Sequence, residues 1–152
     1  MGGNRRSGFY ERTVGSRPRG RLSGKTDNKT RDELRVIEEL LERGYNVKII
    51  PESRIQDDRT PDLAVNSDHK EVTLTEIKTL HHPNTNTGCR RVKDAIKQNA
   101  QNVIIDARKA DITKEQADEI VNRARGSFPD KKLPINVEIL TNEGSYYYIK
   151  DI

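Results

Sequence analysis

The sequence predicts an α/β (α+β) fold: an αβββαβ core with a mixed sheet flanked by helices, followed by a C-terminal helix and a β-hairpin. Capping-box signatures precede two amphipathic stretches and indicate helix starts. Short runs rich in β-branched and apolar residues lie between turn signals and indicate strands. Three early strands, a crossover helix and a fourth strand need both antiparallel and parallel pairing, and therefore a mixed sheet.

The first helix is predicted over residues 31–43. The Thr30-x-x-Glu33 capping box starts it, apolar residues at helical spacing give it one apolar face, and Gly44 ends it. A strand at residues 45–50 follows directly, because this segment alternates apolar and polar residues.

Residues 63–65 and 72–80 are predicted to be neighbouring antiparallel strands, since the segment between them is short and polar. Residues 81–89 are interpreted as a loop because they contain a proline and Gly88. A helix over residues 90–101 follows, with its apolar residues on one face.

The last third of the chain begins with residues 102–106, a short apolar run that predicts a buried parallel strand. The next helix is predicted over about residues 113–125, again behind a capping box. Strands at residues 135–140 and 145–149 flank a short turn that contains a glycine, so they are predicted to form a closing hairpin.

Charge divides the chain into two parts. Residues 29–152 are predicted to form one domain. Residues 1–28 are an irregular, Gly- and Arg-rich tail or linker with seven basic and two acidic residues, a net charge of +5. The whole chain carries +4, so the remaining residues sum to −1. The tail would attract a polyanionic partner, or it would serve as a solubilising linker.

Composition excludes several classes of protein. No apolar run approaches the length that spans a bilayer. No apolar segment follows Arg5 and Arg6, so the N-terminus is not a secretory signal. The chain has one cysteine, Cys89, which rules out an internal disulfide framework and a multi-cysteine zinc site.

The most informative residues are Asp62, after Pro61, and Glu76-Ile77-Lys78, which follows fourteen residues later. Side chains alternate between the two faces of a strand, so Glu76 and Lys78 point the same way and Ile77 points the other way. Asp62 begins the neighbouring strand. Two carboxylates and one amine can therefore converge, in the layout of a metal-dependent phosphodiesterase site.

This set of residue types suits phosphodiester cleavage. Asp62 and Glu76, with the Ile77 carbonyl oxygen, would hold Mg²⁺ or another divalent cation such as Mn²⁺ or Zn²⁺. Lys78 would orient a water molecule, stabilise transition-state charge or accept a proton. The alternative is a turn carboxylate at Asp62 and an ordinary ion pair between Glu76 and Lys78 on a solvated sheet face.

The Thr60-Pro61-Asp62-Leu63 segment, the Glu76-Ile77-Lys78 strand and the order of the first six elements resemble the core of PD-(D/E)xK nucleases. Over about residues 29–140 the chain is most similar to C-terminal toxin domains of bacterial polymorphic toxins. These include the tRNA-cleaving domains of contact-dependent growth inhibition systems. The resemblance implies a nuclease toxin domain that cleaves RNA, with tRNA favoured over DNA.

The resemblance also implies a cognate immunity protein as partner. It implies delivery as part of a larger secreted or cell-surface toxin and action in the cytoplasm of the target cell. The chain starts with Met1 and shows no delivery segment, so we expect a separated toxin domain or a small stand-alone, cytoplasmic protein. A monomer is favoured.

In PD-(D/E)xK nucleases a glutamate on the preceding helix often completes the site. Glu33 is the candidate catalytic residue here, with its role in the capping box as the alternative and Glu38 in reserve. Residues after the Glu-x-Lys strand are candidate contacts to nucleic acid. The alternative for each is that it is an ordinary surface residue without such a role. These candidates are His81, His82, Arg90, Arg91, Lys93 and Lys97.

Two other functions remain open at this point. One is a DNA endonuclease of the same superfamily, resolvase-like or restriction-like; a resolvase would need a dimer with paired sites. The other is a non-catalytic nucleic-acid-binding accessory domain that keeps the fold and the basic tail.

Overall fold

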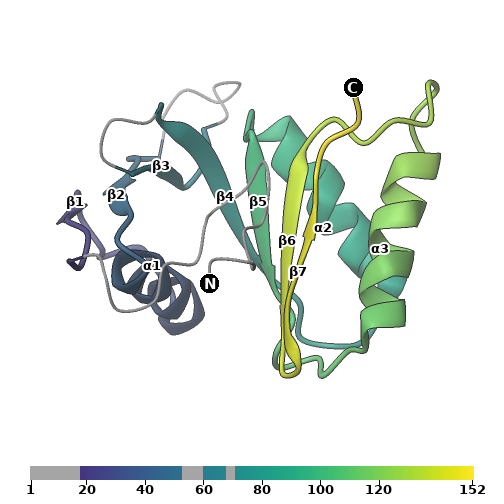
Figure 1. The fold of residues 1–152 in the computed structure, drawn as a ribbon, viewed down its shortest axis with the longest axis horizontal. Coiled ribbons are helices and arrows are strands. Elements are labelled where there is room, and N and C mark those ends of the chain that lie inside the picture. Colours follow the sequence, from purple (N-terminus) through teal and green to yellow (C-terminus); the bar gives the residue numbers. More distant parts are fainter. Residues whose placement is uncertain (1–17, 53–59, 68–70) are drawn as a thin grey trace, which may run out of the picture.

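The strands of one mixed sheet lie side by side in the order in which they occur along the chain (Figure 1). The computed structural model describes residues 18–52, 60–67 and 71–152, and within them the sheet has seven strands. The strands are β1 (Leu22–Ser23), β2 (Asn46–Ile49), β3 (Leu63–Asn66), β4 (Thr73–Thr79), β5 (Asn102–Asp106), β6 (Asn136–Thr141) and β7 (Gly144–Tyr148). The helices are α1 (Arg31–Glu42), α2 (Thr85–Lys97) and α3 (Lys114–Gly126).

Pairing in the sheet follows from the connections. Strands β2, β3 and β4 are antiparallel neighbours; a short segment joins β3 to β4, and a longer one, residues 50–62, joins β2 to β3. Strands β4, β5 and β6 are parallel, because α2 and α3 carry the chain back between them. A tight turn joins β6 and β7, which are antiparallel. The predicted mixed α+β fold, including the closing hairpin, is confirmed.

Helix α1 covers one face of the sheet near β2, β3 and β4. Its capping box is present, as predicted. The helix and this face of the sheet share one apolar cluster, which includes Ile77 from β4. Because side chains alternate along a strand, Glu76 and Lys78 belong to the opposite face. The cluster consists of Val36, Ile37, Leu40, Leu41, Tyr45, Val47, Ile49, Leu63, Val65, Ile77, Ile104 and Leu140.

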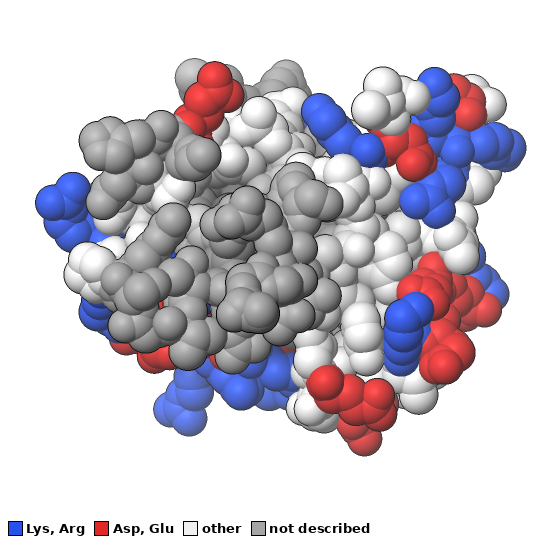
Figure 2. Space-filling view, viewed as in Figure 1, with Lys and Arg blue, Asp and Glu red and all other residues white. Residues whose placement is uncertain are grey.

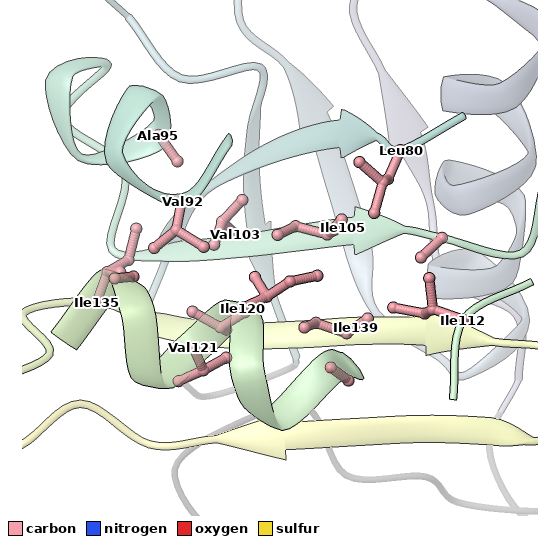
Figure 3. Packing of buried hydrophobic residues seen from close by; sticks show 14 of the residues in the cluster. Leu80, Val92, Ala95, Val103, Ile105, Ile112, Ile120, Val121, Ile135 and Ile139 are labelled. Carbon is pink, nitrogen blue, oxygen red and sulfur yellow. The ribbon is translucent and has the colours of Figure 1, made fainter. Parts of the chain in front are cut away.

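Helices α2 and α3 pack on that opposite face, over β5 to β7 (Figure 1). Figure 3 shows the apolar side chains that lie between the two helices and the sheet. Gly88 of α2 is buried against α3: a Cβ atom built there would lie 2.5 Å from Ile120 Cδ1. Any larger residue at this crossing of the helices would therefore force the Ile120 side chain to shift. The labelled residues in Figure 3 are Leu80, Val92, Ala95, Val103, Ile105, Ile112, Ile120, Val121, Ile135 and Ile139.

The start of α2 differs from the prediction. The sequence predicted a loop over residues 81–89, but the helix begins at Thr85. Asn84 is its N-cap, and its side-chain oxygen accepts the Thr87 backbone N–H at 3.1 Å. Gly88 was interpreted as a loop residue, whereas its actual role is close packing between helices.

The region predicted to be an irregular basic tail contains a strand that the sequence did not reveal. Leu22 and Ser23 pair in parallel with Val47 and Lys48 of β2. Residues 1–17 of the predicted tail lie outside the described residues. No helix within the described ranges has the length and apolar character needed to cross a membrane.

Candidate active site

The register of β3 and β4 places Asp62 beside Glu76. Ala64 pairs with Leu74, so the residue two before Ala64 comes opposite the residue two after Leu74. The Asp62 backbone N–H donates to Glu76 Oε1 at 3.0 Å, and Lys78 Nζ lies 3.0 Å from Glu76 Oε2. The structure thus brings together the three side chains that the sequence singled out.

The Asp62 carboxylate also continues the backbone ladder between the two strands. Regular pairing ends at Leu63 and Thr75, which leaves Pro61 opposite Ile77. The Ile77 backbone N–H donates to Asp62 Oδ2 at 3.0 Å instead. The N–H and C=O groups of one strand residue point to the same side of the strand, so the Ile77 carbonyl also faces the Asp62 side.

A fourth charged residue, Lys29, completes this cluster. Its Nζ lies 3.1 Å from Asp62 Oδ1, and 8% of its side chain is exposed, compared with 21% for Asp62. Sequence reasoning missed Lys29, which directly precedes the helix N-cap Thr30. The sequence held one weak signal. A cation at the positive end of a helix is unfavourable, so a lysine kept there needs an acidic partner.

Glu76 has the most perturbed environment of the four. Burial raises the pKa of Glu76 to about 7, the negative charge of Asp62 adds to the rise, and the Lys78 ammonium opposes it. A carboxyl group with a pKa near neutrality can gain or lose a proton under the conditions in a cell. Such groups are typical of acid–base chemistry.

Glu33 occupies its capping-box position. Its Oε1 accepts the Thr30 backbone N–H at 2.8 Å, and its own N–H donates to Thr30 Oγ1 at 3.1 Å. The hydrogen bonds of Glu33 are therefore those of the capping box, which was the alternative to a catalytic role. A catalytic role for Glu33 stays a prediction. Glu38, the reserve candidate, forms an ion pair with Arg19 in which both side chains are about half exposed.

The donor atoms near Asp62 suit a hard cation. Two carboxylates and a carbonyl group supply oxygen only, which is the ligand chemistry of Mg²⁺ and Mn²⁺. Zn²⁺ more often takes nitrogen or sulfur ligands. Among the residues that the structure describes, no group of three or more His, Cys, Asp or Glu side chains is placed to hold a metal. Water would have to supply the remaining ligands, as is usual for Mg²⁺.

The predicted contacts to nucleic acid do not form one cluster. His81 and His82 are exposed just after β4. The basic residues on α2 were expected at the helix N-terminus, but α2 begins at Thr85. They therefore lie beyond the first turn, where free backbone N–H groups no longer favour an anion. The residues concerned are Arg90, Arg91, Lys93 and Lys97.

Helical spacing divides these basic residues between two flanks of α2. Arg90 and Lys93 line a surface pocket together with Arg123 of α3. Arg91 lies 3.9 Å from Asp94, and neither residue lines that pocket. On the face shown in Figure 2, acidic and basic side chains are intermixed on the right, where Figure 1 places α3.

Comparisons with known proteins agree with this fold. A family model described as "Contact-dependent growth inhibition CdiA C-terminal domain" matches residues 59–146. A chain from the solved structure "CdiA-CT/CdiI toxin and immunity complex from Burkholderia pseudomallei" is similar with a TM-score of 0.52 and 15% sequence identity. The similarity covers 86% of the present chain and 99% of that chain, and at this identity it shows the fold alone. A search of curated proteins found no match.

Proposed function

This chain belongs to the contact-dependent growth inhibition CdiA C-terminal domain family, and from that premise we propose that this toxin domain inhibits growth of its target cell as an RNA endonuclease. The observation that carries the proposal is the convergence of Asp62, Glu76 and Lys78 on β3 and β4. Their order in the chain and their places on adjacent strands support a PD-(D/E)xK-type site.

Side-chain exposure differs among the four charged residues of the cluster and indicates which of them would meet the substrate. Asp62 and Lys78 each keep 21% of the side chain exposed, whereas Glu76 keeps 7% and Lys29 keeps 8%. Asp62 and Lys78 would therefore contact the substrate. Lys78 Nζ would donate to an oxygen of the scissile phosphate and stabilise the charge that develops there. Glu76 would hold Lys78 in position, and Lys29 would hold Asp62.

Asp62 and Glu76, with the Ile77 carbonyl, would hold a divalent cation, Mg²⁺ or Mn²⁺. Such a cation supplies Lewis acidity toward the phosphate and lowers the pKa of a bound water molecule. The Coulomb repulsion that Asp62 contributes to the raised pKa of Glu76 would also weaken when a cation lies between the two carboxylates. Two positive charges already lie beside these carboxylates: Lys29 contacts Asp62, and Lys78 contacts Glu76.

RNA, and tRNA in particular, is the proposed substrate because the sequence resembles tRNA-cleaving toxin domains. A cognate immunity protein is the proposed partner, since the similar solved structure is described as a toxin and immunity complex. Membership of the family implies delivery into target cells as part of a larger cell-surface toxin. Action in the cytoplasm of the target cell is part of the proposal.

The test is a cleavage assay in which purified protein meets total tRNA and plasmid DNA in parallel, with Mg²⁺ or with EDTA. Lys78→Met should lower the rate of RNA cleavage at least about 100-fold. Lys132→Met, which removes an exposed lysine outside the site, should leave it unchanged. Nicked plasmid with intact tRNA would replace the proposal with a DNA endonuclease. Binding of nucleic acid without cleavage by the folded wild-type protein would indicate an accessory domain.

A further inference from the structure

A surface pocket of about 630 Å³ lies where α2 meets the C-terminal part of α3. Three of its lining side chains are cationic: Arg90 and Lys93 from α2, and Arg123 from α3. Among the residues that the structure describes, no aspartate or glutamate lines it. The lining residues are Asn84, Asn86, Cys89, Arg90, Lys93, Arg123, Gly126 and Ser127.

The positive charges in this pocket are weakly compensated. Arg90 Nη2 donates to the neutral Thr87 Oγ1 at 3.2 Å. Arg123 donates to the neutral Asn86 side chain, and its nearest carboxylate contact among the described residues is Glu119 at 3.8 Å. Within the described part of the chain, Lys93 has no ion pair. Guanidinium and ammonium groups held this way retain most of their attraction for an anion.

The neighbouring surface of α3 has the opposite character. A second pocket on α3 is lined by Glu115, Asp118, Glu119 and Asn122, and it shares Arg123 with the first. An acidic protein surface would also be attracted to the positive charges of the first pocket. A flat surface of that kind would not fill the concave pocket. A polyphosphate chain gains at the cationic pocket and is repelled at the acidic one, so its path is confined to the α2 side.

We propose that the pocket of Arg90, Lys93 and Arg123 binds backbone phosphates of the RNA substrate at a place outside the candidate active site. This inference rests on the proposed function, because it takes RNA as the ligand. Strand β4 carries Lys78 and leads within six residues to Asn84 at the edge of the pocket. Six residues span at most about 20 Å, so one folded RNA can contact both places.

The experiment measures binding of tRNA in a Lys78→Met background, which prevents cleavage during the measurement. Lys93→Gln/Arg123→Gln removes one cation from each helix. We expect roughly 10-fold weaker binding at moderate salt, because each cation makes a charge-assisted contact. The log–log salt dependence of the affinity should become shallower by about 1.4 to 1.8, since two phosphate contacts are lost. With Lys78 intact, the same double variant should raise KM and leave kcat nearly unchanged.

The matched control is Lys132→Gln/Lys150→Gln, which lowers the net charge equally at two exposed positions outside the pocket. Equal weakening by both double variants would show that only net charge matters and would overturn the proposal. Unchanged tRNA binding in the pocket variant would overturn it as well, even if cleavage by the wild type is observed. Pocket-dependent binding of tRNA by a wild-type protein that does not cleave it would keep the phosphate site and reject the nuclease. Thermal unfolding of each variant verifies that the fold is intact.

Discussion

Replacing Glu76 with glutamine should stabilise the folded domain at pH 8 while removing a proposed catalytic group. Glu76→Gln keeps the shape of the side chain and an oxygen that accepts the Asp62 N–H. The pKa of Glu76 rises from its ordinary 4.5 to about 7 on folding, chiefly through burial. The folded state therefore holds this proton more tightly than the unfolded state does. The stability that this proton contributes is fully present below about pH 4.5 and is lost as the pH rises through about 7.

The size of the effect follows from the pKa difference. A rise from 4.5 to about 7 corresponds to about 3 kcal/mol of stability lost by pH 8. Glutamine avoids this loss, and the attraction between ionised Glu76 and Lys78 needs no separate correction because it is already included in the pKa of about 7. The expected gain at pH 8 is therefore about 3 kcal/mol, or about 6–12 °C in Tm for a chain of this length.

Urea unfolding between pH 5 and pH 8, in EDTA, measures this prediction. The wild type and Glu76→Gln should have similar free energies of unfolding near pH 5 and separate as the pH rises. Glu143→Gln changes an exposed glutamate and should stay within about 0.5 kcal/mol of the wild type throughout. A Glu76→Gln protein less stable than the wild type at pH 8 would refute the reasoning. It would mean that the ion pair with Lys78 outweighs the cost of burial.

Two further substitutions test the packing and the cluster around Asp62. Gly88→Ala should lower the free energy of unfolding by about 1–3 kcal/mol in urea, because the added methyl group meets Ile120 at 2.5 Å. Gly126→Ala, where nothing lies within 4 Å of the new Cβ, should be neutral or gain up to about 1 kcal/mol, and equal losses at both glycines would contradict this account. Lys29→Met should lower stability by about 1–3 kcal/mol, because it removes a mostly buried ion pair. It should also tighten binding of Mn²⁺ in calorimetry, since a cation leaves Asp62 Oδ1; unchanged affinity would contradict the proposed metal position.

Local patterns predicted most elements of the fold and the three residues that meet on β3 and β4. Both capping boxes are present as hydrogen-bonded pairs at the helix starts. The period of two along β4 correctly placed Glu76 and Lys78 on one face, because alternation depends only on backbone geometry. The short polar connection correctly indicated that β3 and β4 are antiparallel neighbours.

The features that the sequence did not reveal depend on contacts distant in the chain. Strand β1 is two residues long and exists because it pairs with β2, so no local periodicity marks it. Lys29 reaches Asp62 across 33 positions of sequence. Gly88 was misinterpreted because a glycine in a loop and one that lets two helices touch look the same in a sequence.

The agreement between strand order and chain order has a consequence for folding. Each strand of the described sheet after β1 pairs with the strand that precedes it in the chain. Every new pairing therefore closes only the segment between two consecutive strands. The sheet can therefore grow one strand at a time from β1 to β7, without inserting a later strand between two that have already paired.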